Sequence, residues 1–391
     1  MNRKTVLKNG VRIVSERLPH VRSVSLGIWV NTGSRDESPL ENGVSHFIEH
    51  MSFKGTRNRS GFQIAKDLDA IGGFSNAFTG KETTCFYGRV LDRNFPLLAD
   101  ILSDIFVHPT FQSEDMERER EVIFQEINMV EDTPDDYLNL LFQRLFWPDH
   151  PIGRSVLGSA ETVARMDQDM IREYIRKYYV PERVLVVAAG NVDHEQMVEY
   201  FRPIFETDNN FSGDNPQRSL PLTSGGVLVT PKPLEQVHLF LGSDAPSHVD
   251  ESRFACALFN TILGGNMSSR LFQEIRENRG LAYSVYSFFS PYADAGLFGV
   301  YAGTDPRNMN SVLEITKNEI RKLRSGQLSK DDLAAAKENA IGGMYLASES
   351  SDSRMMRAAK NEFIFQRYVD YEEVVESIER VSVDDVVEMA D

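Results

Sequence analysis

The sequence predicts an α+β protein of two duplicated domains, each a mainly antiparallel sheet with helices packed on one face. Two observations predict this class. Segments with the alternation typical of strands are separated by segments of helical period, and hairpin-like turns join neighbouring strands. The same succession then occurs again at an offset of about 214–217 residues, as a duplication would produce. A chain of 391 residues is also too long for one ordinary hydrophobic core.

The first half of the chain contains each element type of this fold. An Asn-Gly turn joins two short strands near the start, and the apolar run RVLVVAAGNV is typical of a buried strand. In chain order we expect strands at 5–16 and 24–33, helices at 38–55 and 60–73, a hairpin at 74–90, helices at 91–106, 114–133, 135–147 and 167–179, a strand at 183–192 and a helix at 193–205.

The domain boundaries follow from the repeat and from composition. Residues 208–226 are polar and rich in Gly, Pro and Ser, which is typical of a linker. We therefore expect an N-terminal domain at 1–207 and a homologous C-terminal domain at 227–391. The second copy ends before any counterpart of RVLVVAAGNV, so we expect that domain to lack its last strand in this chain.

Composition narrows the class of function. The formal net charge of −16 argues against a general nucleic-acid binder, which needs a basic surface for phosphates. Apolar runs are too short for a signal peptide or a membrane helix, so we expect no membrane partner. The two cysteines, Cys85 and Cys256, fall in different halves, which argues against a disulfide framework and favours a reducing cytoplasm.

The segment 38–55, SPLENGVSHFIEHMSFKG, carries the main chemical signal. Ser38 suits a helix N-cap, and a helix would place His46 and His50 one turn apart on one face, with Glu49 beside them. Two neutral imidazoles at this spacing can hold zinc, and an adjacent carboxylate can accept a proton from water. This order, H-x-x-E-H, is the inverted zinc-peptidase motif, although the pentapeptide alone is also compatible with solvated or core histidines.

A third protein ligand is needed if water holds the fourth position of a tetrahedral zinc site. The acid-rich helix at 114–133 offers several carboxylates, most of which belong to a solvated face. Glu119 and Glu126 are seven apart on one stripe that borders apolar positions, so these two are the inward candidates. The residues alone do not choose between them. The corresponding positions of the second copy are near Asn260, Ala335 and Gly342, so we expect no metal site there.

These motifs together resemble the M16 (pitrilysin, or insulysin-like) metallopeptidases, in particular the short two-domain branch that includes mitochondrial processing peptidase subunits and bacterial processing-protease-like proteins. The resemblance covers nearly the whole chain, including LKNGVRIVSE, GGFSNAFTGKETTCFY and HPIGRSVLG. It implies that His46, His50 and Glu126 bind one Zn²⁺ per chain and that Glu49 is the general base. It also implies that Glu119 is the acid that orients a histidine ligand.

The resemblance assigns residues outside the zinc motif as well. In LFQEIRENRGLAYSV, Arg276 and Tyr283 match an arginine and a tyrosine that contact substrate near the scissile bond, where they can stabilise an oxyanion. Asn76 and Ala77 match an Asn-Ala pair on a strand edge to which a peptide adds as a further strand. Without the resemblance, Arg276 and Tyr283 would be interpreted as a surface charge and a packing aromatic, and Asn76 as a turn residue.

The expected function is zinc-dependent hydrolysis of peptides or unfolded segments. Family members of this size form clamshell dimers around a chamber, which implies a homodimer in which the partner's C-terminal domain supplies Arg276 and Tyr283. The alternative is a non-catalytic structural or partner subunit of the same fold, because some relatives have lost the chemistry. A peptidase that needs a separate partner subunit is a further possibility, which the presence of both motif sets in one chain disfavours.

Overall fold

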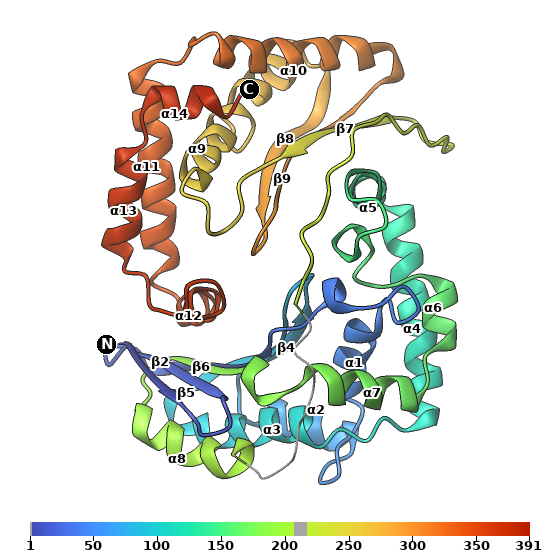
Figure 1. Ribbon diagram of the computed structural model, residues 1–391, viewed down its shortest axis with the longest axis vertical. Helices are drawn as coiled ribbons and strands as arrows, with labels where there is room; N and C mark the ends of the chain where they lie inside the picture. Colours follow the sequence, from blue (N-terminus) through green and yellow to red (C-terminus); the bar gives the residue numbers. More distant parts are fainter. Residues whose placement is uncertain (1, 207–216) are drawn as a thin grey trace. The chain divides into compact units, whose positions relative to one another are not determined.

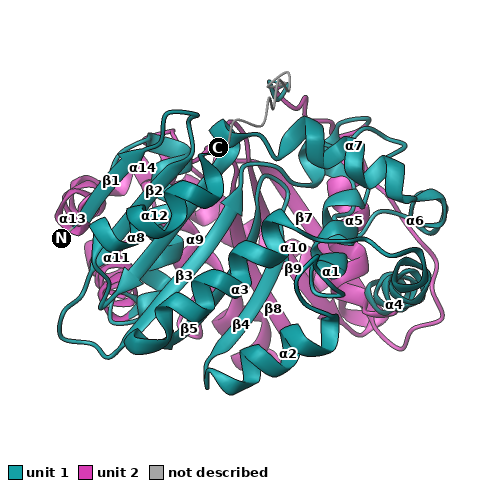
Figure 2. Cartoon of the chain, turned by 90° about the horizontal axis from the view of Figure 1, so that it is seen from below, with its two compact units in different colours: residues 1–131, 149–219, 347–368 teal, residues 132–148, 220–346, 369–391 magenta. Residues whose placement is uncertain are grey.

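The computed structural model describes residues 2–206 and 217–391, which form two compact units. Unit 1 combines most of the first half of the chain with a segment near the C-terminus. Unit 2 combines most of the second half with a segment of the first (Figure 2). The segments are 1–131, 149–219 and 347–368 for unit 1, and 132–148, 220–346 and 369–391 for unit 2.

Unit 1 is built on a six-stranded sheet in the order β1-β2-β6-β3-β5-β4. The β2–β6 pair is parallel and the other pairs are antiparallel. Its strands are β1 (Asn2–Val6), β2 (Arg12–Arg17), β3 (Ser23–Val30), β4 (Phe74–Thr79), β5 (Thr84–Leu91) and β6 (Val184–Gly190). Its α-helices are α1 (Val44–Ser52), α2 (Gly61–Ala70), α3 (Phe95–Val107), α4 (Ser113–Asp132), α6 (Ala160–Arg165), α7 (Gln168–Tyr178), α8 (His194–Phe205) and α12 (Ser351–Phe365).

The two faces of this sheet are covered by different parts of the chain. Helices α3 and α8 pack on one face, in a core that contains Leu26, Phe86 and Val186. On the other face, Met355 of α12 packs in a cluster with Trp29. Helix α12 lies on the opposite side of the sheet from α3 and α8 (Figure 1). Both faces of the central strands are therefore buried, as the apolar run of β6 indicates.

Unit 2 contains a three-stranded antiparallel sheet in the order β7-β9-β8. Its strands are β7 (Val237–Asp244), β8 (Ala282–Pro291) and β9 (Gly296–Thr304). Its helices are α5 (Pro134–Phe146), α9 (Arg253–Leu263), α10 (Met309–Arg324), α11 (Lys330–Ala347), α13 (Tyr371–Arg380) and α14 (Val383–Glu388), with a short π-helical turn, η5 (Phe272–Glu277). The strand order repeats that of β3-β5-β4 in unit 1, as expected for a duplicated fold.

The predicted α+β class is confirmed, but in unit 1 helices pack on both faces of the sheet and not on one face alone, because α12 covers the second face. The compact units also differ from the two halves of the sequence repeat. Helix α5 belongs to unit 2, where Phe142 stacks on Phe240 of β7 with ring centroids 4.3 Å apart. Helix α12 belongs to unit 1. The compact units therefore differ from the expected ranges 1–207 and 227–391 by the exchange of these two helices. Residues 207–216 of the expected linker lie outside the described residues, and 217–226 contain neither helix nor strand.

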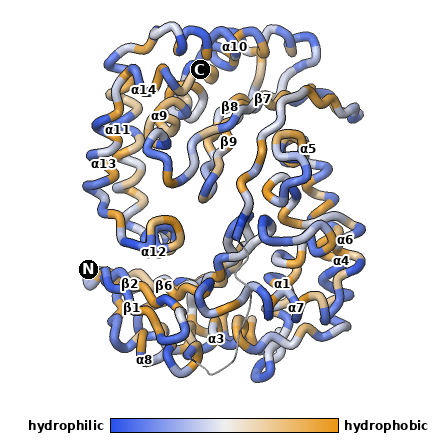
Figure 3. Tube along the Cα trace, in the orientation of Figure 1, coloured by the Kyte–Doolittle hydropathy of each residue, from blue (hydrophilic) through white to orange (hydrophobic). Residues whose placement is uncertain are grey.

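The hydropathy of the chain matches these elements. Along the helices the trace changes between hydrophobic and hydrophilic residues within a turn or two (Figure 3), which is typical of elements buried on one side. Among residues 2–206 and 217–391, no helix has the length and apolar character needed to cross a membrane.

Candidate metal centre

The helix that carries the H-x-x-E-H motif is α1, and it is shorter than the sequence predicts. It begins at Val44 and ends at Ser52, so Ser38 is not its N-cap and the expected range 38–55 is wrong at both ends. The residue before the helix is Gly43, with a left-handed φ of 98°. A Cβ there would lie 2.7 Å from the Leu157 carbonyl oxygen, so both conformation and space require glycine.

A buried acid from the preceding loop caps this helix. One oxygen of Glu37 accepts from the backbone N–H of Gly43 (2.7 Å) and the side-chain amide of Asn42 (2.9 Å), and the other accepts from the N–H of Ser45 (2.9 Å). These bonds satisfy N–H groups at the helix start that have no partner within the helix. Burial raises the pKa of the Glu37 carboxyl, and the hydrogen bonds from Ser45, Asn42 and Gly43 oppose that rise. The position of the motif therefore depends on Glu37.

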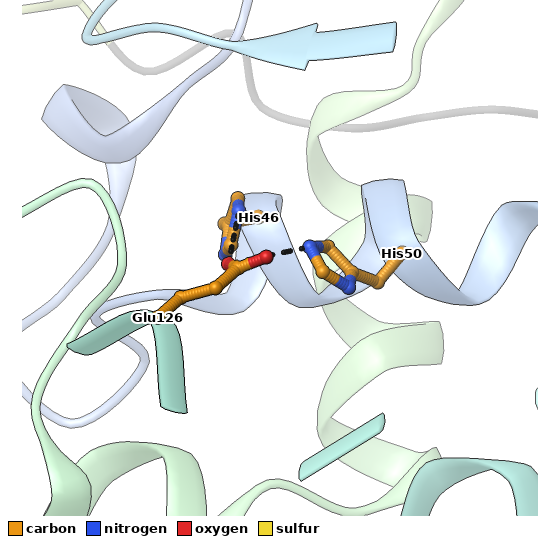
Figure 4. Close-up of side chains that lie close together, drawn as sticks. All are labelled: His46, His50 and Glu126. Atoms are coloured by element: carbon orange, nitrogen blue, oxygen red, sulfur yellow. Dashed lines mark ion pairs between the residues drawn. The ribbon is translucent and has the colours of Figure 1, made fainter. Parts of the chain in front are cut away.

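His46, His50 and Glu126 converge on one point. His46 and His50 lie one turn apart on α1 with ring centroids 4.6 Å apart, and Glu126 reaches them from α4. The Glu126 Oε2 atom lies 3.5 Å from His46 Nε2 and 3.6 Å from His50 Nε2 (Figure 4). One candidate ligand atom from each residue lies within 4.8 Å of the other two. Among the described residues no second group of this kind is found, in either unit.

Glu119 takes a different position from Glu126, although both are on α4. Its Oε2 lies 3.1 Å from His50 Nδ1, and its Oε1 lies 2.6 Å from Lys54 Nζ. Because His50 Nδ1 faces this carboxylate, Nε2 is the nitrogen left to face Glu126. The structure thus separates the two acids that the sequence left as alternatives: Glu126 faces both imidazoles, and Glu119 lies behind one of them.

The three converging groups fit a zinc ion. Burial, with a smaller effect of neighbouring His50, lowers the pKa of His46 to about 3, so its imidazole is neutral at ordinary pH and has a lone pair for a metal. Ligand atoms at the corners of a tetrahedron with bonds of about 2.05 Å are about 3.4 Å apart, close to the 3.5 and 3.6 Å observed. Two imidazoles and one carboxylate form the donor set of many zinc sites that keep a position open.

Glu49 lies between the two histidines in sequence and contacts a strand of the sheet. Its Oε2 accepts a hydrogen bond of 2.5 Å from the hydroxyl of Thr79, the last residue of β4. Burial raises the pKa of Glu49; Thr79 and His50 lower it, and Glu126 raises it further. Thr79 was not among the residues predicted from sequence. The one available signal was its place, two residues after Ala77 in the strand expected to bind substrate.

Asn76 and Ala77 lie on β4, which is one of the two edge strands of the sheet, at the opposite edge from β1. β4 pairs with β5 on one side, and no strand among the described residues pairs with its other side. The side-chain oxygen of Asn76 accepts from the backbone N–H of Ala77 at 2.9 Å. An edge strand beside a metal centre offers main-chain groups to which an extended peptide can pair.

Arg276 and Tyr283 contact each other in unit 2. Arg276 lies on the π-helical turn η5, and its guanidinium carbon is 4.5 Å from the centre of the Tyr283 ring. Tyr283, on β8, is 78% exposed. Short π-helical turns frequently occur at functional sites. The structure therefore pairs these two predicted residues on the surface of their own unit.

Unit 2 also contains a cavity of about 180 Å³. Its lining includes the aromatic residues Phe240, Tyr286 and Phe288, together with Asp135 and Asp136 at the start of α5.

An H-x-x-E-H helix joined by a glutamate from a second helix, on an α+β chain of two related units, defines the inverzincin class of metal site. The chain belongs to peptidase family M16. The family model described as Insulinase (Peptidase family M16) matches residues 12–160, and the model described as Peptidase M16 inactive domain matches residues 165–340.

Curated relatives and solved structures agree with this family. A relative from Streptomyces coelicolor, named an uncharacterized zinc protease, is 42% identical over 98% of this chain and 85% of its own length. One from Bacillus subtilis with the same description is 38% identical over 99% of this chain and 94% of its own. The crystal structure of a protease from Helicobacter pylori has a TM-score of 0.91 at 22% identity, covering 100% of this chain and 96% of that one, which supports the fold.

Proposed function

We propose that this protein is a zinc-dependent endopeptidase that hydrolyses peptides or unfolded segments. The observation that carries the proposal is the convergence of His46, His50 and Glu126, with Glu49 on the same helix held by a hydrogen bond. The zinc-protease names of relatives at about 40% identity support the same function.

The residues divide the chemistry between them. His46, His50 and Glu126 would hold one zinc ion per chain, which when bound supplies a Lewis acid for the scissile carbonyl and for water. Glu119 keeps the His50 ring oriented so that Nε2 faces the site. Glu49 accepts the proton of the attacking water and returns it to the leaving amine. The raised pKa of Glu49 suits this role, because a base works best when its pKa is close to the operating pH.

The substrate would lie along β4 as an added strand. Main-chain hydrogen bonds to this edge, at Asn76 and Ala77, would bind peptides of many sequences. To make such a bond through its N–H, Ala77 would have to give up the contact with the Asn76 side chain. Unfolded segments would be preferred to folded proteins, because an added strand must be extended over several residues and accessible along one edge.

The proposed role of Arg276 and Tyr283 requires a homodimer. We propose that Arg276 of the partner subunit and Tyr283 of the partner subunit face each zinc site and stabilise the oxyanion that forms during hydrolysis. A mixture of Glu49→Gln chains with Tyr283→Phe chains should then regain activity, because some dimers contain one intact site. A mixture as inactive as either parent would contradict this part of the proposal.

The test of the whole proposal combines metal analysis with peptide cleavage. Wild-type protein should contain about one zinc per chain and cleave members of a panel of quenched fluorescent peptides. Glu49→Gln should keep the zinc and lose cleavage by a factor of about 10³ or more, since proton transfer is lost. Bound zinc with no cleavage of any peptide by the wild type would instead indicate a non-catalytic subunit of the same fold.

A further inference from the structure

The hydroxyl of Thr79 connects the edge strand to the proposed base. Thr79 is the last residue of β4 and pairs in register with Thr84 of β5. Its Oγ1 lies 2.5 Å from Glu49 Oε2, whereas its next polar neighbour, the Ser45 carbonyl oxygen, is 3.4 Å away. The carboxylate is therefore its main acceptor.

The neighbouring threonine shows what an ordinary structural hydroxyl does here. Thr84 is fully buried, and its hydroxyl donates to the backbone carbonyl of Thr32, two residues after the end of β3, at 3.0 Å. The acceptor of the Thr79 hydroxyl is instead a side-chain carboxylate, that of Glu49 on α1. A bond to a charged acceptor is shorter and stronger than one to a neutral carbonyl.

We propose that Thr79 is a positioning residue for Glu49, an inference that rests on the proposed peptidase function. By holding Oε2, the hydroxyl fixes the direction of a side chain with three rotatable bonds and leaves Oε1 free for proton transfer. A hydrogen bond to a charged group changes the population of the held conformer about tenfold to hundredfold.

Because Thr79 lies at the end of an edge strand, substrate binding along that strand should also affect how Glu49 is held. A peptide that pairs along β4 near Asn76 and Ala77 immobilises the strand that carries the hydroxyl. Peptides long enough to pair with β4 should therefore gain in kcat as well as in KM, because remote binding then improves the alignment of the base.

The test compares Thr79→Val, which removes the hydroxyl at nearly constant volume, with Thr79→Ser, which keeps it. Thr79→Val should lower kcat about tenfold to hundredfold, with KM within about threefold and zinc content unchanged, and should abolish the kcat gain of longer peptides. Thr79→Ser should restore most of the wild-type kcat. Thr84→Val, which removes a hydroxyl from the adjacent strand, is the matched control and should keep the wild-type kcat.

A spectroscopic measurement tests the contact without turnover. In metal-free protein with ¹³C-labelled glutamate carboxyls, the Glu49 signal, assigned by its absence in Glu49→Gln, should shift in Thr79→Val and stay in place in Thr79→Ser. An unshifted signal, a wild-type kcat in Thr79→Val, or a loss of zinc that accounts for its lost activity would each overturn the inference. A wild type that cleaves no peptide would refute the proposed function itself, and the inference with it.

Discussion

The Glu119 carboxylate contacts an imidazole through one oxygen and an ammonium through the other. We expect Glu119→Gln to weaken zinc binding about tenfold to hundredfold, because the carboxylate that orients His50 is lost. Competition with a fluorescent chelator would measure this. Glu121→Gln, an exposed position on the same helix, is the matched control and should bind zinc as the wild type does. Equal zinc affinities of the wild type and both variants would show that Glu119 does not contribute to zinc binding.

A second single residue, His194, predicts how the free energy of unfolding depends on pH. Its two ring nitrogens lie 2.8 Å from the hydroxyls of Thr5 and Ser15, and burial, with a smaller effect of Arg3, lowers its pKa below 6.5. Below pH 6.5 the unfolded chain therefore binds a proton at this residue that the folded chain does not, and the free energy of unfolding falls as the pH falls.

The His194→Gln variant isolates this effect. Its free energy of unfolding should fall less steeply than that of the wild type between pH 6.5 and 5, by up to about 1.4 kcal/mol per pH unit. Urea unfolding at several pH values measures the two slopes. If the free energies of unfolding of the two proteins fall in parallel with pH, His194 is not the titrating group. A constant difference in stability between them, present also at pH 8, does not affect this test.

Sequence predicts single residues well where spacing along one helix decides the geometry. His46 and His50 are four apart, so a helix alone brings them together. Glu119 and Glu126 share a stripe of α4, and the residues alone could not rank them, because the choice depends on how α4 packs beside α1. The contact between Thr79 and Glu49 joins elements thirty residues apart, which no local pattern encodes.

At the scale of the element, the start of α1 shows how tertiary contacts override a local signal. Ser38, Pro39 and Glu41 form a plausible capping sequence, and the Glu41 carboxylate does accept from the Ser38 N–H at 3.1 Å. The helix nevertheless begins at Val44, because Gly43 adopts a left-handed φ and Glu37 supplies the cap. Local patterns predicted the existence and type of this helix, and the contacts of Glu37 and Gly43 set its first residue.

Gly43→Ala tests this account. The new methyl group would occupy a strained φ and lie 2.7 Å from a backbone oxygen, so we expect a loss of about 2 kcal/mol or more in stability and weaker zinc binding. Gly342→Ala is the control: Gly342 lies inside α11 with open space around it, and alanine there should stabilise by about 0.5–1 kcal/mol. Thermal unfolding measures both variants. A neutral Gly43→Ala would contradict the account of the helix start.

At the scale of the whole molecule, the duplication was visible in the sequence, but the exchange of α5 and α12 was not. The repeat aligns segments along the chain and carries no information about which sheet a helix covers. Helix α12 is held to the sheet of unit 1 by apolar contacts and by charged pairs, including Arg354 with Glu16 and Glu362 with Arg12. These partners are more than 300 residues apart in the sequence.

Because α12 completes unit 1 from the second half of the chain, a fragment of the first half alone should be unstable. A fragment of residues 1–206 lacks α12, so the face of its sheet that contains Trp29 is uncovered, and we expect it to aggregate or unfold easily. A synthetic peptide of residues 347–368 should bind this fragment, raise its melting temperature and shift its tryptophan fluorescence to the blue. A peptide of residues 371–388, from unit 2, is the control. A fragment that is fully stable alone and indifferent to both peptides would contradict the role of α12.

The late position of α12 also has a consequence during synthesis. The six strands of unit 1 are complete once Gly190 has been translated, but the helix that covers their second face ends at Phe365. At about 5–20 residues per second, the ribosome needs roughly ten to thirty seconds for the residues between them. Throughout that interval the nascent sheet exposes an apolar surface. We expect a chaperone to bind this surface until residues 351–365 have been translated and can cover it.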